Sequence, residues 1–255
     1  MSLFRQLTIH FETSAQLPPP YSYQYALTLT PVAELLQVDL KLTYTHRDEL
    51  DADEIEAEGF TDNDDYHWKG ELDKVWRGEL EKLLAKTRLS GGIMLDDEQD
   101  FLTLEWQTEK LQRGQPENLS DWHYFAQELL QATFETSGKE RAFELHILDV
   151  TAQGTVEAIV TASFRTRSAQ IKRVVDGGKS SLRFYPWHEL PHLMEVLYAP
   201  NWLSDTAAAQ KPKRNGLYFN PGDEMWYEYN KQVVEPGKGA STLPKLKNLI
   251  GKLLS

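Results

Sequence analysis

The chain has 255 residues, enough for one large domain or two small ones, and 40% of them are hydrophobic. It contains no cysteine, which excludes disulfides, thiolate metal sites and cysteine catalysis. The formal charge of −12 is uneven, because residues 1–138 hold 27 Asp+Glu against 11 Lys+Arg, whereas residues 139–255 hold 12 against 16.

The same features limit the partners. The longest apolar stretches are too short to cross a bilayer, and Met1–Arg5 lacks the apolar core of a signal peptide. We therefore expect no membrane span and a cytoplasmic location. The positive balance of the second half comes without a zinc-finger, RRM or helix-turn-helix pattern, so no nucleic-acid partner is expected.

The first fifty residues contain three runs in which apolar and polar side chains alternate, at residues 7–11, 21–29 and 36–44. A period of two places the apolar side chains on one face of a strand. This alternation predicts an antiparallel sheet with one covered face, and it is unlike the continuous apolar strands of a parallel core.

An acidic stretch follows, with ten Asp and Glu and no Lys or Arg between Asp48 and Asp65. It predicts a solvated loop, or a solvated helix followed by a loop. Some of these acids could gather around Ca²⁺ or Mg²⁺, but an EF-hand loop requires glycine where Glu56 or His67 stands. The candidate ligands are Asp51, Asp53, Asp62, Asp64 and Asp65, with a second group at Asp96, Asp97, Glu98 and Asp100. Cation binding stays open, and no cofactor is predicted.

Two helices are predicted to cover the apolar face of this sheet. Apolar residues at helical spacing indicate one helix over Trp68–Lys86 and another over Ser120–Ser137, with Ser120 as N-cap and Gly138 as C-cap. A strand over Phe101–Glu109 lies between them. Residues 142–185 then read as a meander of alternating strands with a turn at 176–179.

The segment His188-Glu189-Leu190-Pro191-His192 fits the H-E-x-x-H pattern of zinc proteases. That chemistry needs both histidines on one helical face, and Pro191 interrupts the required helix. Proline favours the first turn of a helix, so we expect a helix that begins at Pro191 and leaves His188 outside it. A metal site at His188, Glu189 and His192 remains the alternative.

The C-terminal segment is the feature that bears most directly on function. After a Gly-rich connector at 236–241, residues 242–255 form an amphipathic helix with three lysines off its apolar face. The helix could pack on the protein's own sheet, dock on a protein partner, or touch an anionic membrane surface. Its candidate binding residues are Leu246, Leu249, Ile250 and Leu253.

Aromatic residues are also concentrated after residue 180, where they could line a ligand pocket or form cross-strand core pairs. The candidates are Tyr185, Trp187, Trp202 and Trp226.

Together the patterns predict an α+β fold: a large, meander-rich antiparallel sheet with helices on one face and a C-terminal amphipathic helix. We expect one domain over 1–235, or two sheet halves meeting near residue 140, followed by a linker and helix over 236–255. The predicted function is non-catalytic binding or interaction. The alternatives are a metal-dependent hydrolase, an assembly subunit docking through its last helix, and a catalytic triad drawn from distant residues.

Overall fold

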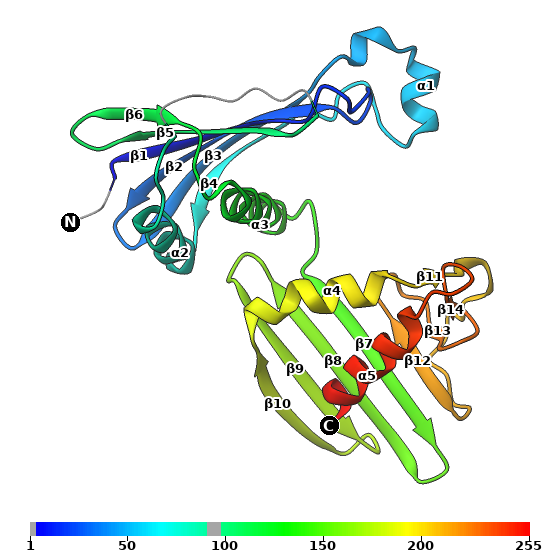
Figure 1. The fold of residues 1–255 in the computed structure, drawn as a ribbon. Helices are drawn as coiled ribbons and strands as arrows, with labels where there is room; N and C mark the ends of the chain where they lie inside the picture. The colour runs from blue at the N-terminus through cyan, green and yellow to red at the C-terminus, as the bar shows by residue number, and fades with distance from the viewer. Residues whose placement is uncertain (1–3, 91–97) are drawn as a thin grey trace. The chain divides into compact units, whose positions relative to one another are not determined.

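A computed structural model of the protein describes residues 4–90 and 98–255 (Figure 1). The chain divides into two compact units, Met1–Glu140 and Arg141–Ser255. Each unit is built on a six-stranded antiparallel sheet with helices, so the predicted α+β class is confirmed. The sequence left open a single large sheet or two sheet halves, and the described residues form two six-stranded sheets, one in each unit.

The sheet of the first unit has the strand order β4-β3-β2-β1-β5-β6, and every neighbouring pair is antiparallel. Its strands are β1 (Gln6–Glu12), β2 (Tyr23–Val32), β3 (Leu35–Tyr44), β4 (Tyr66–Leu72), β5 (Phe101–Gln107) and β6 (Leu111–Gly114). The alternation read from the sequence holds in these strands. Leu7, Leu27 and Leu40 are fully buried, whereas Thr8 and Thr28 lie on the other face and hydrogen-bond each other at 3.2 Å.

Helices α2 (Lys74–Ala85) and α3 (Leu119–Ser137) supply the other side of this core. Trp76 of α2 and Trp122 of α3 are fully buried, and the ring of Phe125 packs edge-on against both. Gly138 ends α3 with a φ of 75°, as predicted for a C-cap. The predicted N-cap Ser120 is wrong, because the helix begins at Leu119 and Asn118 stands at the N-cap position.

The predicted helix over Trp68–Lys86 is wrong in its first third. Trp68 and Leu72 belong to β4, and the helix begins only after Asp73, whose side chain accepts a hydrogen bond from the Val75 amide at 3.0 Å. A spacing of four residues satisfies a period of two as well as a helical period, so Trp68 and Leu72 fit both patterns. The capping Asp73 is the signal that separates them.

The second unit has the strand order β10-β9-β8-β7-β12-β13, and the meander predicted over 142–185 is confirmed. Its strands are β7 (Phe143–Thr151), β8 (Gly154–Ser163), β9 (Ser168–Val175), β10 (Lys179–Tyr185), β12 (Gly216–Asn220) and β13 (Tyr227–Glu228), and β11 (Asn201–Trp202) pairs separately with β14 (Val233–Val234). Positive φ angles at Asp176 and Gly177 form the turn between β9 and β10.

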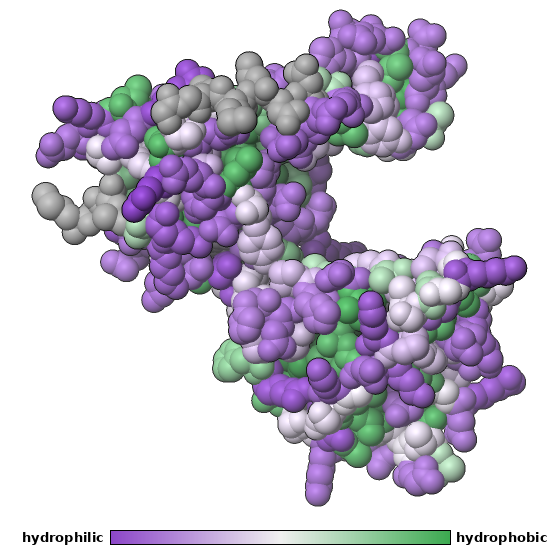
Figure 2. All heavy atoms as spheres, viewed as in Figure 1, coloured by the Kyte–Doolittle hydropathy of each residue, from purple (hydrophilic) through white to green (hydrophobic). Residues whose placement is uncertain are grey.

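Helices α4 (Leu190–Tyr198) and α5 (Thr242–Leu254) pack on one face of this sheet. In Figure 2 hydrophobic residues show among the hydrophilic ones over the part of this unit where α4 and α5 lie. Leu145, Val160 and Phe219 from the strands and Leu193 from α4 are fully buried there. No helix in the described part of the chain is both long enough and apolar enough to span a bilayer.

Candidate interaction surface

The apolar face of α5 lies inside the second unit. Leu246, Ile250 and Leu253 are buried in the core that the sheet forms with α4 and α5, and Leu249 packs against the same core as a partly buried residue. The side chains proposed to meet a partner therefore contact the protein's own sheet.

Both ends of α5 are tied to neighbouring segments. The Glu235 carboxylate accepts hydrogen bonds from the Thr242 hydroxyl at 2.6 Å and from the backbone amides of Thr242 and Leu243 at 2.9 and 3.1 Å, and these bonds lower its pKa. At the other end Arg173 donates to the Leu254 carbonyl at 2.5 Å, and Arg183 donates to the Lys252 carbonyl at 2.8 Å. These contacts satisfy terminal backbone groups that a helix cannot pair by itself.

The four candidate aromatic residues do not line one pocket. Tyr185 is buried in the core that α4 and α5 cover, and Trp187 and Trp202 pack against that core. Trp202 contacts the rings of Phe219 and Tyr227 at 6.0 and 5.0 Å. Trp226 lies in a separate small cluster with Leu148, Val150 and Tyr218.

The H-E-x-x-H residues fall on two different elements. His188 and Glu189 belong to a short 3₁₀ turn, Trp187–Glu189, and His192 lies in α4, which begins at Leu190. The expected helix start is thus one residue from the observed one, and His188 is outside the helix as predicted. His192 is paired with Glu195 at 3.6 Å. Among residues 4–90 and 98–255, no three His, Asp or Glu side chains are grouped closely enough to hold a metal ion.

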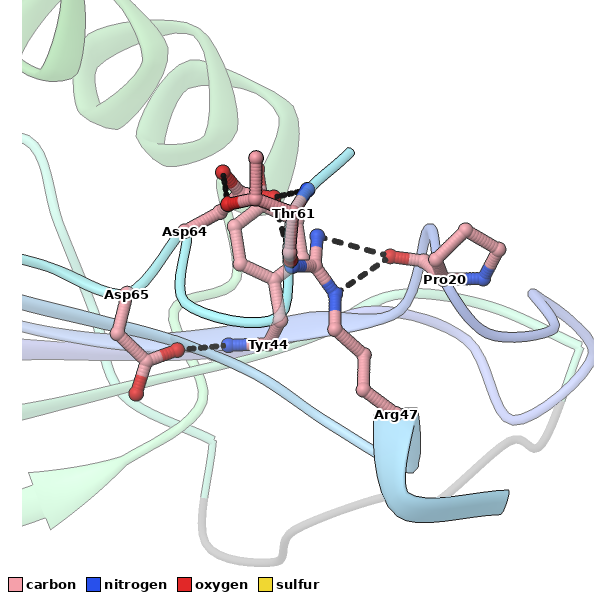
Figure 3. A network of polar contacts seen from close by, with 6 residues as sticks. All are labelled: Pro20, Tyr44, Arg47, Thr61, Asp64 and Asp65. Atoms are coloured by element: carbon pink, nitrogen blue, oxygen red, sulfur yellow. Dashed lines mark hydrogen bonds and ion pairs between the residues drawn. The ribbon is translucent and has the colours of Figure 1, made fainter. Parts of the chain in front are cut away.

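The acidic stretch forms the connection between β3 and β4, with a 3₁₀ turn at Arg47–Glu49 and helix α1 at Ala52–Ala57. The predicted solvated helix and loop are therefore present, and the Arg47 side chain binds residues of the loop that follows α1 (Figure 3). Its guanidinium lies 3.8 Å from the ring centroid of Tyr44 and donates to the Asp64 carboxylate at 2.7 Å and to the Thr61 carbonyl at 2.5 Å.

Two of the candidate cation ligands are already engaged in this connection. Burial opposes ionisation of Asp64, but hydrogen bonds from Thr61 and the guanidinium of Arg47 outweigh it and lower the pKa of Asp64 to about 2. Asp65 accepts a hydrogen bond from the Tyr44 amide at 2.9 Å. Asp96 and Asp97 of the second acidic group lie outside the described residues.

The most exposed apolar side chains of the described structure lie on β10, at one edge of the second sheet. β10 pairs with β9 from Lys179 opposite Val175 to Tyr185 opposite Ala169, and it has no other strand neighbour in the described chain. An edge strand directs alternate N–H and C=O groups away from the sheet, where another strand can pair with them. This edge is seven residues long.

The two faces of β10 are used differently. Arg183 and Tyr185 lie on the helix-covered face, where Arg183 caps α5 and burial raises the pKa of Tyr185. Leu182 and Phe184 point to the opposite face and are 64% and 88% exposed. A phenylalanine that exposed is unusual, because burying such a side chain stabilises a protein by about 1.5–3 kcal/mol.

The β9–β10 hairpin is basic. Its strands carry Lys172, Arg173, Lys179 and Arg183, and the one acid of the hairpin is Asp176 in the turn. Within the described residues no carboxylate forms an ion pair with these four cations, since the two arginines bind neutral carbonyls. The hairpin therefore presents a backbone edge, two apolar side chains and a net positive charge.

The other sheet edges are protected in ways that natural proteins use against unwanted strand pairing. In β4 the residues that face away from the helices are His67, Lys69 and Glu71, all charged or polar. β6 has four residues and β13 has two. Next to β13, Trp226 exchanges two backbone hydrogen bonds with Ala208 at 2.8 and 2.9 Å.

The sequence predicts the strand at Leu182 and Phe184 but not its exposure, because which strand ends a sheet depends on the pairing of segments far apart in the chain.

No family model, curated protein or solved structure matches the chain, so its function is inferred from the surfaces of the structure.

Proposed function

We propose that the protein is a non-catalytic interaction module that binds an extended segment of another protein along β10. The observation that carries this proposal is the pair Leu182 and Phe184, exposed on an edge strand whose outer side has no strand neighbour among the described residues. Strand addition uses backbone hydrogen bonds for affinity and pockets for alternate side chains for specificity.

The charge of the hairpin selects the chemistry of the partner. Lys172, Lys179 and Arg183 favour a segment with acidic side chains, and Leu182 and Phe184 favour apolar side chains at alternate positions of that segment. A second copy of this chain is a poorer occupant, because its β9–β10 hairpin carries the same net positive charge.

The test uses a defined probe, an acetylated and amidated heptapeptide of alternating glutamate and valine that matches the length of β10. We expect saturable binding by fluorescence polarisation with a labelled peptide, and slower amide hydrogen exchange in β10 when the peptide is bound. The matching peptide of alternating lysine and valine should bind at least 10-fold more weakly.

Variants locate the binding surface. Phe184→Ser should weaken binding of the acidic peptide about 10-fold, because it removes the largest exposed apolar anchor. The matched control is Leu111→Ser on the edge strand of the first unit, where Leu111 is 58% exposed, and it should bind as the unaltered protein does. Equal affinity in Phe184→Ser, or no binding by a folded protein, would overturn the proposal. A dimer that Phe184→Ser abolishes would assign the edge to a second copy instead.

We infer a cytoplasmic setting for this interaction. The support is compositional. The chain of 255 residues has no cysteine and so cannot form the disulfides that are common in proteins of oxidising compartments. Fluorescence microscopy of the tagged protein in its host checks this placement, and an extracellular signal would contradict it.

A further inference from the structure

A cavity of about 310 Å³ lies on the face of the second sheet opposite to α4 and α5. Leu148, Val150 and Val174 supply apolar side chains to its wall, and Glu157, Lys211 and Lys213 supply charged ones. Its volume is at the small end of the range for ligand sites, about 300–1,000 Å³.

The apolar wall exists because the connection 207–215 lies over this face of the sheet. Leu148 and Val150 are buried with Tyr218 and Trp226, although they alternate with core residues that face the helices. The connection is held at one end by the backbone pairing of Ala208 with Trp226 and further along by the ion pair of Lys211 with Glu157 at 2.7 Å.

The charges of the cavity leave one cation uncompensated. The Glu157 side chain is 17% exposed and lies between Lys211 and His146, whose Nδ1 is 3.6 Å from its carboxylate. Its negative charge is thus already matched by Lys211. Lys213 is exposed and has no ion pair within the described chain, so the cavity carries a surplus of one positive charge.

We propose that this cavity binds a small organic monocarboxylate with an aliphatic or aromatic body. The body packs on Leu148, Val150 and Val174, and the carboxylate meets the ammonium group of Lys213. An inorganic anion gains no apolar contact with this wall and is therefore disfavoured. An organic cation is disfavoured because the Glu157 carboxylate is already paired with Lys211.

The probe for the test is 3-phenylpropionate, titrated into the full chain with methyl groups of leucine and valine labelled for NMR. We expect saturable shifts of the Leu148, Val150 and Val174 methyl signals. The neutral 3-phenylpropanol tests the charge, and acetate tests the apolar body. Each should bind at least 5-fold more weakly than 3-phenylpropionate.

The decisive variant is Lys213→Gln, which removes the charge at an exposed position and leaves the fold intact. It should weaken 3-phenylpropionate at least 5-fold, whereas Lys238→Gln in the Gly-rich connector should bind as the unaltered protein does. Equal binding of the alcohol, unchanged affinity in Lys213→Gln, or no saturable shift would overturn the proposal. Phe184→Ser should leave this binding unchanged, so failure at this cavity and failure at β10 are distinguishable.

Discussion

At the scale of single residues, Gly70 shows how a side chain's absence can be a structural requirement. A Cβ atom at this position would lie 2.4 Å from the indole of Trp68, its neighbour two residues earlier on the same face of β4. That distance is far below van der Waals contact, so the indole occupies the space that glycine leaves.

Gly70→Ala should therefore destabilise the first unit. Moving the indole costs about 1–3 kcal/mol, the usual range for overpacking. Urea denaturation followed by tryptophan fluorescence measures this change. The control is Gly78→Ala in α2, where a Cβ meets nothing within 4 Å, and the free energy of unfolding should rise by about 0.5–1 kcal/mol. Equal effects of the two substitutions would contradict the steric explanation.

Asp64 predicts a pH-dependent contribution to stability. Its pKa falls from 3.8 to about 2 on folding, so its ionised form stabilises the folded state above about pH 3.8. This contribution is lost as the pH falls from 3.8 through 2.

Asp64→Asn should accordingly be less stable than the unaltered protein at pH 7, by about 1.5–3 kcal/mol, because the Arg47 guanidinium loses a charged acceptor. The difference should shrink toward pH 2. Thermal unfolding at a series of pH values measures it. Asp62→Asn, exposed in the same connection, serves as the control. A stability difference that is the same at pH 2 and pH 7 would rule out this role for Asp64.

At the scale of elements, the strands could be predicted and the limits of one helix could not. The alternation in β1, β2 and β3 depends only on residues adjacent in sequence, so a period of two identifies these strands directly. Trp68 and Leu72 satisfy two periods at once; Asp73 marks the start of the helix after them, whereas the pairing of these two residues with β3 is not displayed by the sequence.

Substitutions in α5 can test whether its apolar face is buried in the core of the second unit. Leu246→Ala should lower the free energy of unfolding by about 2–5 kcal/mol, because the side chain is fully buried in the core of the second unit. Leu249→Ala on the same helix is the matched control, and its effect should be smaller because Leu249 is only partly buried. Chemical denaturation measures both. A free energy of unfolding that Leu246→Ala leaves unchanged would contradict the burial of α5 and would favour a partner-binding role for this helix.

At the scale of the whole molecule, the two units differ in charge. Residues 1–140 hold 28 Asp+Glu and 12 Lys+Arg, a balance of −16, whereas residues 141–255 hold 11 and 15, a balance of +4. The asymmetry seen in the sequence therefore follows the division between units.

Separate expression of residues 1–140 and 141–255 should give two folded fragments, because each unit has its own sheet and its own covering helices. At pH 7 the first fragment should bind an anion exchanger and the second a cation exchanger. Circular dichroism and a cooperative melt check the folding of each fragment. A fragment that is unstructured alone would show that its unit depends on the other.

The candidate surfaces are also properties of this scale, which is why the sequence alone did not find them. Phe184 is exposed because it lies on the face of an edge strand that points away from the helices, and the cavity beside Lys213 exists because residues 207–215 cross strands formed much earlier in the chain. The sequence favoured residues such as Leu246 and Trp202 because they are apolar, and for the same reason Leu246 is buried and Trp202 packs against the core of the second unit.

The place of α5 in the chain sets an order of events during synthesis. The first unit has all its strands and helices by residue 140, so it can fold while the ribosome is still extending the chain. The second unit completes its long strands by Asn220 and has α4 by then, but the part of the apolar face that α5 covers stays exposed until Leu246, Ile250 and Leu253 have been made. During that interval the nascent chain presents a partly covered sheet, and exposed apolar surface of this kind is prone to aggregation.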